Sequence, residues 1–140
     1  MPTQLMPREL KLLFLEMLFK SMPVPSTLWL GLATAEFAVE PTMSSLTVAE
    51  PINSMGYDRM ALRSFDWTIR QNPLRADSEA VSFRNIGEER WPTVRTWFLA
   101  TSQNGDGVLL ASGRLRVTRV LMPGDTLELP VSFSFEPLEG

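Results

Sequence analysis

The chain has 140 residues, the usual size of one domain, and its hydrophobic fraction of 44% is sufficient for one core. Its net charge of −3 argues against nucleic acid as the main partner, because phosphate binding needs a basic surface. The chain has no cysteine and no histidine, which excludes disulfides, thiolate nucleophiles, a Ser-His-Asp triad and the usual zinc ligands. We therefore expect no cofactor and no metal site.

The first predicted element is a helix that begins after Pro7 and ends near Lys20. Proline fits the start of a helix, and Pro23 and Pro25 prevent this helix from continuing. Glu16 interrupts the apolar run, no small-residue cleavage site follows, and the run is too short for a bilayer. We interpret the segment as a retained helix and expect neither a signal peptide nor a membrane partner.

The apolar residues of this helix form two stripes, whereas an ordinary surface helix has one. The wide stripe contains Leu10, Leu13, Phe14, Met17 and Leu18. The narrow stripe contains Leu12, Leu15 and Phe19, and the charged residues Glu9, Glu16 and Lys20 separate the two stripes along one edge. The narrow stripe is expected either to be covered by the rest of the domain or to dock onto a second protein.

The next element is a short apolar strand over residues 27–33. The connection over residues 34–54 is long for a compact domain and has little periodicity, so it is predicted to be a functional or mobile loop. Residues 59–63 and 65–69 alternate apolar with polar side chains, and this period of two is typical of half-buried strands. A turn-rich connection is predicted over residues 72–78.

A further strand is predicted over residues 79–85, followed by a polar loop. Residues 94–100 are bulky on both faces, with Val94, Thr96 and Phe98 predicted on one face, so this strand is expected to be covered on both sides.

The turn Asn104-Gly105-Asp106-Gly107 supplies residues that tolerate positive φ and joins residues 94–100 to an antiparallel return strand. Residues 114–120 continue the alternation, and Pro123-Gly124 marks a second tight turn. The last strand is predicted over residues 127–137.

Short strands with regularly spaced turns and one helix predict an all-β fold, an antiparallel β-sandwich of jelly-roll-like type with a short N-terminal α-helix. We divide the chain into a helical arm, residues 1–25, and a β-sandwich domain, residues 26–140.

The candidate catalytic residues are few and are not expected to form an active site. Glu88 and Glu89 are neighbours in a polar loop, so their side chains diverge, and Asp106 and Asp125 are explained as turn residues. Both lysines lie on the N-terminal helix, as its solvated edge. A hydrolase acting on glycans would need clustered carboxylates, so we expect a protein that binds and is not an enzyme.

Tryptophan and arginine residues give further candidates for contact surfaces. Trp91 precedes a proline at the end of a loop, and it is the tryptophan that we expect to be exposed. The other three lie within strands and are expected in the core or in a subunit interface: Trp29, Trp67 and Trp97. Arg114 and Arg116 share a strand face, either as its solvated side or as partners for acidic residues of a neighbouring protein.

Several motifs follow one another in order between residues 28 and 135: LWLGLAT, Gly56-Tyr57 with Arg59, Trp91 with Thr93-Val94, Leu109-Leu110, and Gly124-Asp125-Thr126. In order and spacing they resemble a family of small virion proteins of tailed bacteriophages. The chain departs from the family pattern in lacking the glycines expected over residues 34–54 and in having Trp97 and Phe98 at positions of smaller residues.

The resemblance implies a structural component of a phage particle, located in the virion. The leading hypothesis is a capsid decoration (cement) protein that stabilises the shell by bridging capsid subunits, with the major capsid protein and sister subunits of a homotrimer as partners. The alternative is a tail or tail-fibre component, either an adaptor or a receptor-contact module. The residues expected to contact partners are Leu12, Phe14, Leu15, Met17, Leu18, Phe19, Trp91, Arg114 and Arg116, and residues 34–54 form a second candidate surface.

Overall fold

The computed structural model describes residues 7–38, 41–105 and 107–134. The helical elements are α1 (Arg8–Phe19), α2 (Met43–Thr47) and the 3-10 turn η1 (Ser64–Asp66). The strands are β1 (Thr27–Ala33), β2 (Met60–Arg63), β3 (Trp67–Gln71), β4 (Leu74–Ser78), β5 (Val81–Arg84), β6 (Val94–Ala100), β7 (Leu109–Arg119), β8 (Thr126–Leu129) and β9 (Ser132–Phe133). The fold is an all-β antiparallel sandwich with a short N-terminal helix, which confirms the predicted fold class.

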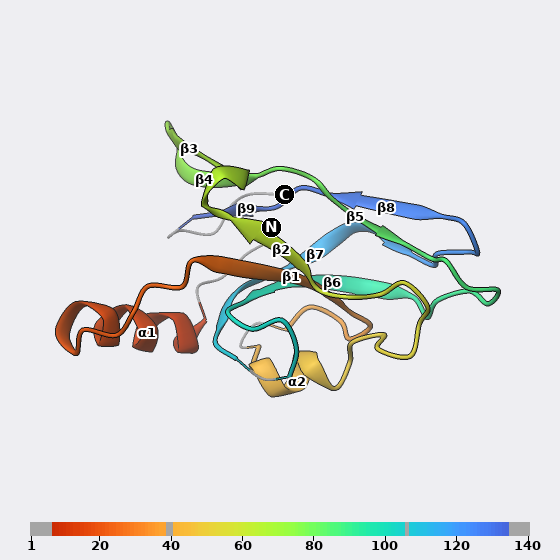
Figure 1. Cartoon of the computed structure of the whole chain (residues 1–140), viewed down its shortest axis with the longest axis horizontal. Coiled ribbons are helices and arrows are strands. Elements are labelled where there is room, and N and C mark those ends of the chain that lie inside the picture. Colours follow the sequence, from red (N-terminus) through yellow and green to blue (C-terminus); the bar gives the residue numbers. More distant parts are fainter. Residues whose placement is uncertain (1–6, 39–40, 106, 135–140) are drawn as a thin grey trace.

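The described strands form three antiparallel sheets. The largest has the order β2-β1-β6-β7, and the smaller two are β3-β4-β9 and β5-β8. In Figure 1 the layer that contains β1 and β6 lies below the two smaller sheets, while α1 extends from one end of the sandwich. The turns between strands follow the predicted chemistry, because Gly105 and Gly124 both have positive φ.

The main core lies between the two layers. Leu30 and Leu32 of β1 and Trp97 and Leu99 of β6 meet Phe83 of β5 in one buried cluster. Since successive side chains of a strand point to opposite faces, the residues between them on β1 and β6 face away from this core. The four-stranded sheet therefore needs a second cover on its other face.

The helix α2 provides this second cover, below the sheet in Figure 1. Its residues Met43 and Leu46 are buried against Phe98 and Leu109. The prediction that residues 34–54 form a loop without regular structure is therefore wrong in part. Five residues of this connection form a helix whose two apolar side chains complete a core, and a pattern so short gives little periodic signal.

Strand β6 is covered on both faces, as predicted. The predicted division of its side chains is wrong at Val94, which joins Trp97 and Leu99 in the main core and does not share a face with Phe98. The reason is a shift in the β6–β7 register between Val94 and Thr96, because an irregularity of this kind reverses the alternation of side chains.

Two other predictions along the chain are corrected. Residues 74–78, predicted to be a turn-rich connection, form strand β4, whose polar side chains Arg75 and Asp77 hid the strand pattern. The last strand is not continuous, because β8 ends before Pro130 and pairs with β5, whereas β9 pairs with β4. Proline lacks the backbone N–H that a strand ladder needs, and here the chain changes sheets. The predicted end of that strand, residues 135–137, lies outside the described residues.

Candidate functional site

The first half of α1 is fixed to the body of the domain by a carboxylate and two leucines. The carboxylate of Glu9 accepts a hydrogen bond from the Met43 N–H at 2.9 Å and another from the Leu109 N–H at 3.0 Å. Leu10 and Leu13 are buried in the main core. Glu9 therefore joins α1 to the first turn of α2 and to the start of β7, whereas from its position we predicted only that it separates the two apolar stripes of the helix.

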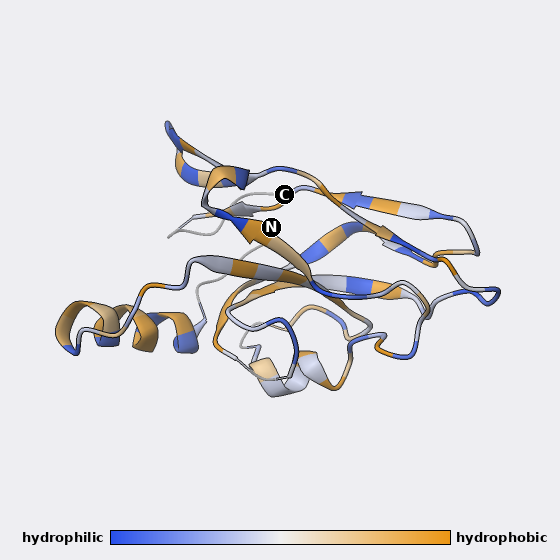
Figure 2. Ribbon diagram, viewed as in Figure 1, coloured by the Kyte–Doolittle hydropathy of each residue, from blue (hydrophilic) through white to orange (hydrophobic). Residues whose placement is uncertain are grey.

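The second half of α1 presents apolar side chains to solvent. Leu15, Leu18 and Phe19 have exposed fractions of 56%, 74% and 75%. With three further exposed side chains they form a surface that we call the helix-arm patch: Leu12, Leu15, Leu18, Phe19, Met22 and Val24. Figure 2 shows α1 as a largely hydrophobic element at the edge of the molecule. The narrow stripe predicted from the sequence is thus exposed, together with Leu18 of the wide stripe.

An apolar pocket adjoins the inner side of the helix. It has a volume of about 280 Å³ and lies between α1 and the strands β3, β4 and β9. Phe14 and Met17, two of the predicted contact residues, line it and pack against the main core. Across the pocket lie Ile69, which is exposed, and Phe133. The apolar surface of the helix therefore continues into a cleft of the sandwich.

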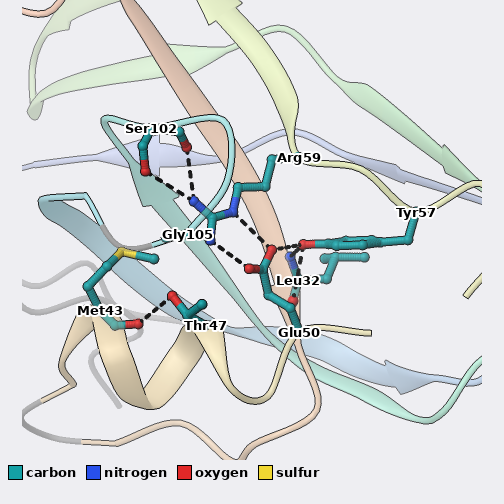
Figure 3. Close-up of polar contacts among 8 residues, drawn as sticks. All are labelled: Leu32, Met43, Thr47, Glu50, Tyr57, Arg59, Ser102 and Gly105. Atoms are coloured by element: carbon teal, nitrogen blue, oxygen red, sulfur yellow. Dashed lines mark hydrogen bonds and ion pairs between the residues drawn. The ribbon is translucent and has the colours of Figure 1, made fainter. Parts of the chain in front are cut away.

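A second candidate is a polar network in the interior, drawn in Figure 3. The guanidinium of Arg59 donates to both carboxylate oxygens of Glu50, through Nε at 2.9 Å and Nη2 at 2.6 Å. It also donates to the backbone carbonyls of Ser102 and Gly105 at 2.9 and 2.8 Å. The Tyr57 hydroxyl donates to the same carboxylate and accepts from the Leu32 N–H at 3.1 Å.

This network is sealed from solvent. Arg59 is only 4% exposed, and its guanidinium lies 5.1 Å from the centre of the Phe98 ring. Burial first, and then the neighbouring Glu50 carboxylate, raise the pKa of Tyr57 far above its ordinary value, so the phenol stays protonated. A bidentate ion pair without access for substrate is suited to joining segments, not to proton transfer. It joins β1, the connection before β2, and the turn after β6.

Trp91 is 1% exposed, so the prediction that it lies on the surface is wrong. Its indole N–H donates to the Met55 carbonyl at 3.1 Å, and its ring meets the edge of Tyr57 at a centroid distance of 6.0 Å. The preceding loop folds inward because the buried amide of Asn85 donates to the carbonyls of Glu89 and Leu121. Trp91 is therefore a core residue that a partner cannot reach in this fold.

The sequence motifs that resemble those of small phage virion proteins lie mainly in the interior of the fold. Tyr57, Trp91 and Val94 belong to the main core, and Arg59 holds the buried network. Gly56 has φ +91°, and a side chain there would meet the Arg84 carbonyl, so glycine is required by the backbone. These motifs thus specify the fold, and they leave the contact surface to other residues.

Glu88, Glu89 and part of the connection over residues 34–54 line one hollow of about 950 Å³. Glu88 and Glu89 are exposed on one side of this hollow, and the exposed apolar residues Val48, Ile52 and Met55 lie on the other. Within the described ranges, no three potential metal ligands gather into a group that could hold an ion.

Arg114 and Arg116 are exposed and flank the buried Leu115 on β7, so they share a face as predicted. The guanidinium of Arg114 lies 5.4 Å from the centre of the Phe37 ring. These arginines lie on a different element from the helix-arm patch. The predicted contact residues therefore separate into an exposed patch, a partly buried group beside the pocket, an arginine pair and the interior Trp91.

Sequence reasoning missed three charged residues with long-range roles, Glu9, Glu50 and Arg59. Arg59 stood in a quoted motif, but its partner could not be identified from the sequence. A signal was present in part, because Arg59 lies between Tyr57 and an apolar strand in a segment that the alternation marked as half-buried. A charge in such a position requires a buried partner.

No family model matches this chain, and no curated protein matches it. Among the described residues, no helix has the length and apolar character needed to span a membrane.

Proposed function

We propose that this chain is a structural protein of a tailed-phage particle, acting as a capsid decoration protein that bridges capsid subunits. The observation that carries the proposal is the helix-arm patch, because large apolar side chains on a projecting helix are suited to a protein interface. The ordered motifs that resemble small phage virion proteins support it. A role in the tail or tail fibre is the alternative, which differs in the partner.

The patch supplies a sufficient driving force for such contacts. Burial of a large apolar side chain contributes about 1.5 to 3 kcal/mol, so Leu15, Leu18 and Phe19 together contribute several kcal/mol before the costs of association. Any contact made only in the assembled state stabilises that state by linkage. A protein that binds at the joints of a shell, with sister subunits in a trimer, therefore raises the stability of the whole shell.

The anchored first turns of α1 hold the helix-arm patch in a fixed direction for binding. Glu9, Leu10 and Leu13 hold the first turns of the helix against the body, so the exposed turns keep a fixed direction. A preordered contact surface loses less conformational entropy on binding than a free segment does. The helix then acts as a short rigid bracket between this domain and its neighbour.

The test is to mix the purified protein with tailless shells, and separately with isolated tails, of the phage that encodes it. Binding to shells, seen by imaging at subunit resolution, is the expected result. The variant Leu15→Gln/Leu18→Gln/Phe19→Gln should lose binding, whereas Ile86→Gln/Met122→Gln, which alters exposed apolar residues elsewhere, should retain it. Binding to tails alone would replace the proposal with its alternative, and binding to neither would overturn both.

A further inference from the structure

A groove separate from the helix arm runs beside β7. It has a volume of about 1060 Å³ and lies between β7 and the segment that contains β8 and β9. In the described part of the chain, β7 is the last strand of its sheet, and no strand pairs with its outer edge. A free strand edge presents backbone N–H and C=O groups that can pair with another extended chain.

The rim of this groove is positively charged. Arg114, Arg116 and Arg119 line it, and none of them forms an ion pair within the described residues. Glu128 is the acidic side chain on the rim that remains unpaired among the described residues. The groove therefore has a local excess of positive charge in a chain of net charge −3.

A fourth arginine of the groove is already neutralised. Arg75 Nε lies 3.1 Å from Asp77 Oδ1, which also accepts from the Ser132 hydroxyl at 2.6 Å. The other oxygen, Oδ2, pairs with Arg70 at 2.7 Å. These hydrogen bonds, that from Ser132 first, lower the pKa of Asp77, so this carboxylate remains charged and occupied by its own neighbours. The three arginines on β7 thus keep no carboxylate partner among the described residues, and Arg114 in addition lies over the Phe37 ring.

The floor of the groove is apolar. Trp97, Leu115, Leu127 and Val131 line it and belong to the main core. A ligand that lies along β7 therefore meets arginines at the rim and hydrophobic side chains beneath. An extended peptide meets both conditions, because its alternate side chains point to opposite faces.

The spacing of the arginines agrees with this type of ligand. Arg114 and Arg116 lie on either side of the buried Leu115, so both side chains are on the exposed face of β7. Alternate side chains of an added strand also share one face, so acidic residues at alternate positions would lie on the same side as the two guanidinium groups. Arginine binds carboxylate through two parallel hydrogen bonds, which favours this pairing.

We infer that this groove binds an extended acidic segment of a neighbouring protein, which pairs with the free edge of β7 and places acidic side chains on Arg114 and Arg116. The alternate side chains of the segment are apolar and cover the floor. The chemistry of the ligand follows from the groove itself. That a capsid subunit carries the segment rests on the proposed function.

The test uses a short fluorescent peptide of alternating Glu and Val residues, titrated with the full-length chain and followed by anisotropy. Saturable binding is expected, and Arg114→Gln/Arg116→Gln should weaken it about tenfold or more, since each bidentate pair is a charge-assisted contact. The matched control Arg84→Gln/Arg90→Gln removes two exposed arginines outside the groove and should leave the affinity unchanged. Hydrogen exchange of amides in residues 114–119 should slow when the peptide binds.

Two altered peptides separate charge from strand pairing. A peptide with Gln in place of Glu, and one with N-methyl groups on alternate backbone amides, should both bind about tenfold more weakly or worse. Equal binding of the Gln peptide overturns the inference. If the N-methylated peptide binds as well as the parent and a DNA oligonucleotide competes for the site, the groove is a general anion surface and strand addition is also overturned.

The outcome is independent of the shell experiment. Peptide binding by a chain that ignores shells and tails would support the groove and refute the proposed function. Shell binding that depends on the helix-arm patch, without peptide binding, would support the proposed function and refute peptide binding in the groove.

Discussion

The helix-arm patch and the network around Arg59 differ in whether their side chains find partners within the chain. The network buries a charged pair, and each charged group of the pair has partners within the chain. The patch leaves large apolar side chains in solvent, although the same helix buries Leu10 and Leu13. The fold thus pairs the charged groups of this network closely, while a projecting helix keeps apolar surface uncovered. An interface that forms after folding has this distribution.

The comparison is tested most strongly at Arg59. Arg59→Met leaves the buried carboxylate of Glu50 without its ion-pair partner and should lower the free energy of unfolding by about 3 to 5 kcal/mol. Urea unfolding followed by tryptophan fluorescence measures this loss. The exposed control Arg84→Met should change the free energy of unfolding by about 0.5 kcal/mol or less.

The double variant Glu50→Leu/Arg59→Met removes both charges and should recover part of the loss. A loss below about 1 kcal/mol in Arg59→Met would show that the network is not sealed as described.

The base of the helix arm gives the next largest effect. Glu9→Ala leaves the N–H groups of Met43 and Leu109 without their acceptor and should cost about 1 to 3 kcal/mol in unfolding free energy. Amide exchange in α1 should quicken in the same variant. Glu16→Ala, on the same helix, is the matched control and should leave both quantities nearly unchanged. Equal effects of the two variants would mean that Glu9 does not anchor the arm.

The sealed network also predicts a response to alkaline pH. Because the pKa of Tyr57 is raised in the folded state, the contribution of its neutral phenol is complete below pH about 10 and is lost as the pH rises further. Stability should fall above pH 10 by up to about 1.4 kcal/mol per pH unit, and Tyr57→Phe should remove this component. Tyr57 is the one tyrosine of the chain, so ultraviolet absorbance follows its ionisation directly. A native titration at the ordinary pKa would contradict burial of the hydroxyl.

The smallest effect on stability is expected at the patch itself. Leu15→Gln/Leu18→Gln/Phe19→Gln should change the unfolding free energy by about 0.5 kcal/mol per substitution or less, because these side chains are exposed and glutamine is a good helix former. Leu10→Gln/Leu13→Gln on the inner side of the same helix should cost several kcal/mol by burying amides in the core. Urea unfolding measures both variants. Similar losses of unfolding free energy would contradict the division of α1 into an exposed side and a buried side.

The elements that could be predicted from the sequence are those with a regular period. The helix, the strand over residues 27–33 and the hairpin around Gly105 have clear apolar spacing or turn residues, and the structure contains all three. Strand β4 was missed because Arg75 and Asp77 obscure its pattern, although their side chains pair with each other on the strand surface.

The partners of buried polar groups could not be predicted, because they depend on contacts between distant segments. The Leu109 N–H and the Glu9 carboxylate that it contacts are 100 residues apart in the chain. Trp91 was misplaced for the same reason, since a tryptophan before a proline resembles a loop residue until Met55 and Tyr57 are known to surround it. Local pattern located the exposed stripe of the helix, and it could not locate the residues that fix the direction of that stripe.

The two hydrogen bonds accepted by Glu9 also impose an order on maturation. The Glu9 carboxylate accepts from the amides of Met43 and Leu109, so α1 takes its final orientation only after translation has passed residue 109. A chain that ends before residue 109 therefore lacks one of the two backbone donors that fix the direction of α1, and the helix gains its full anchorage only when the β6–β7 hairpin has formed.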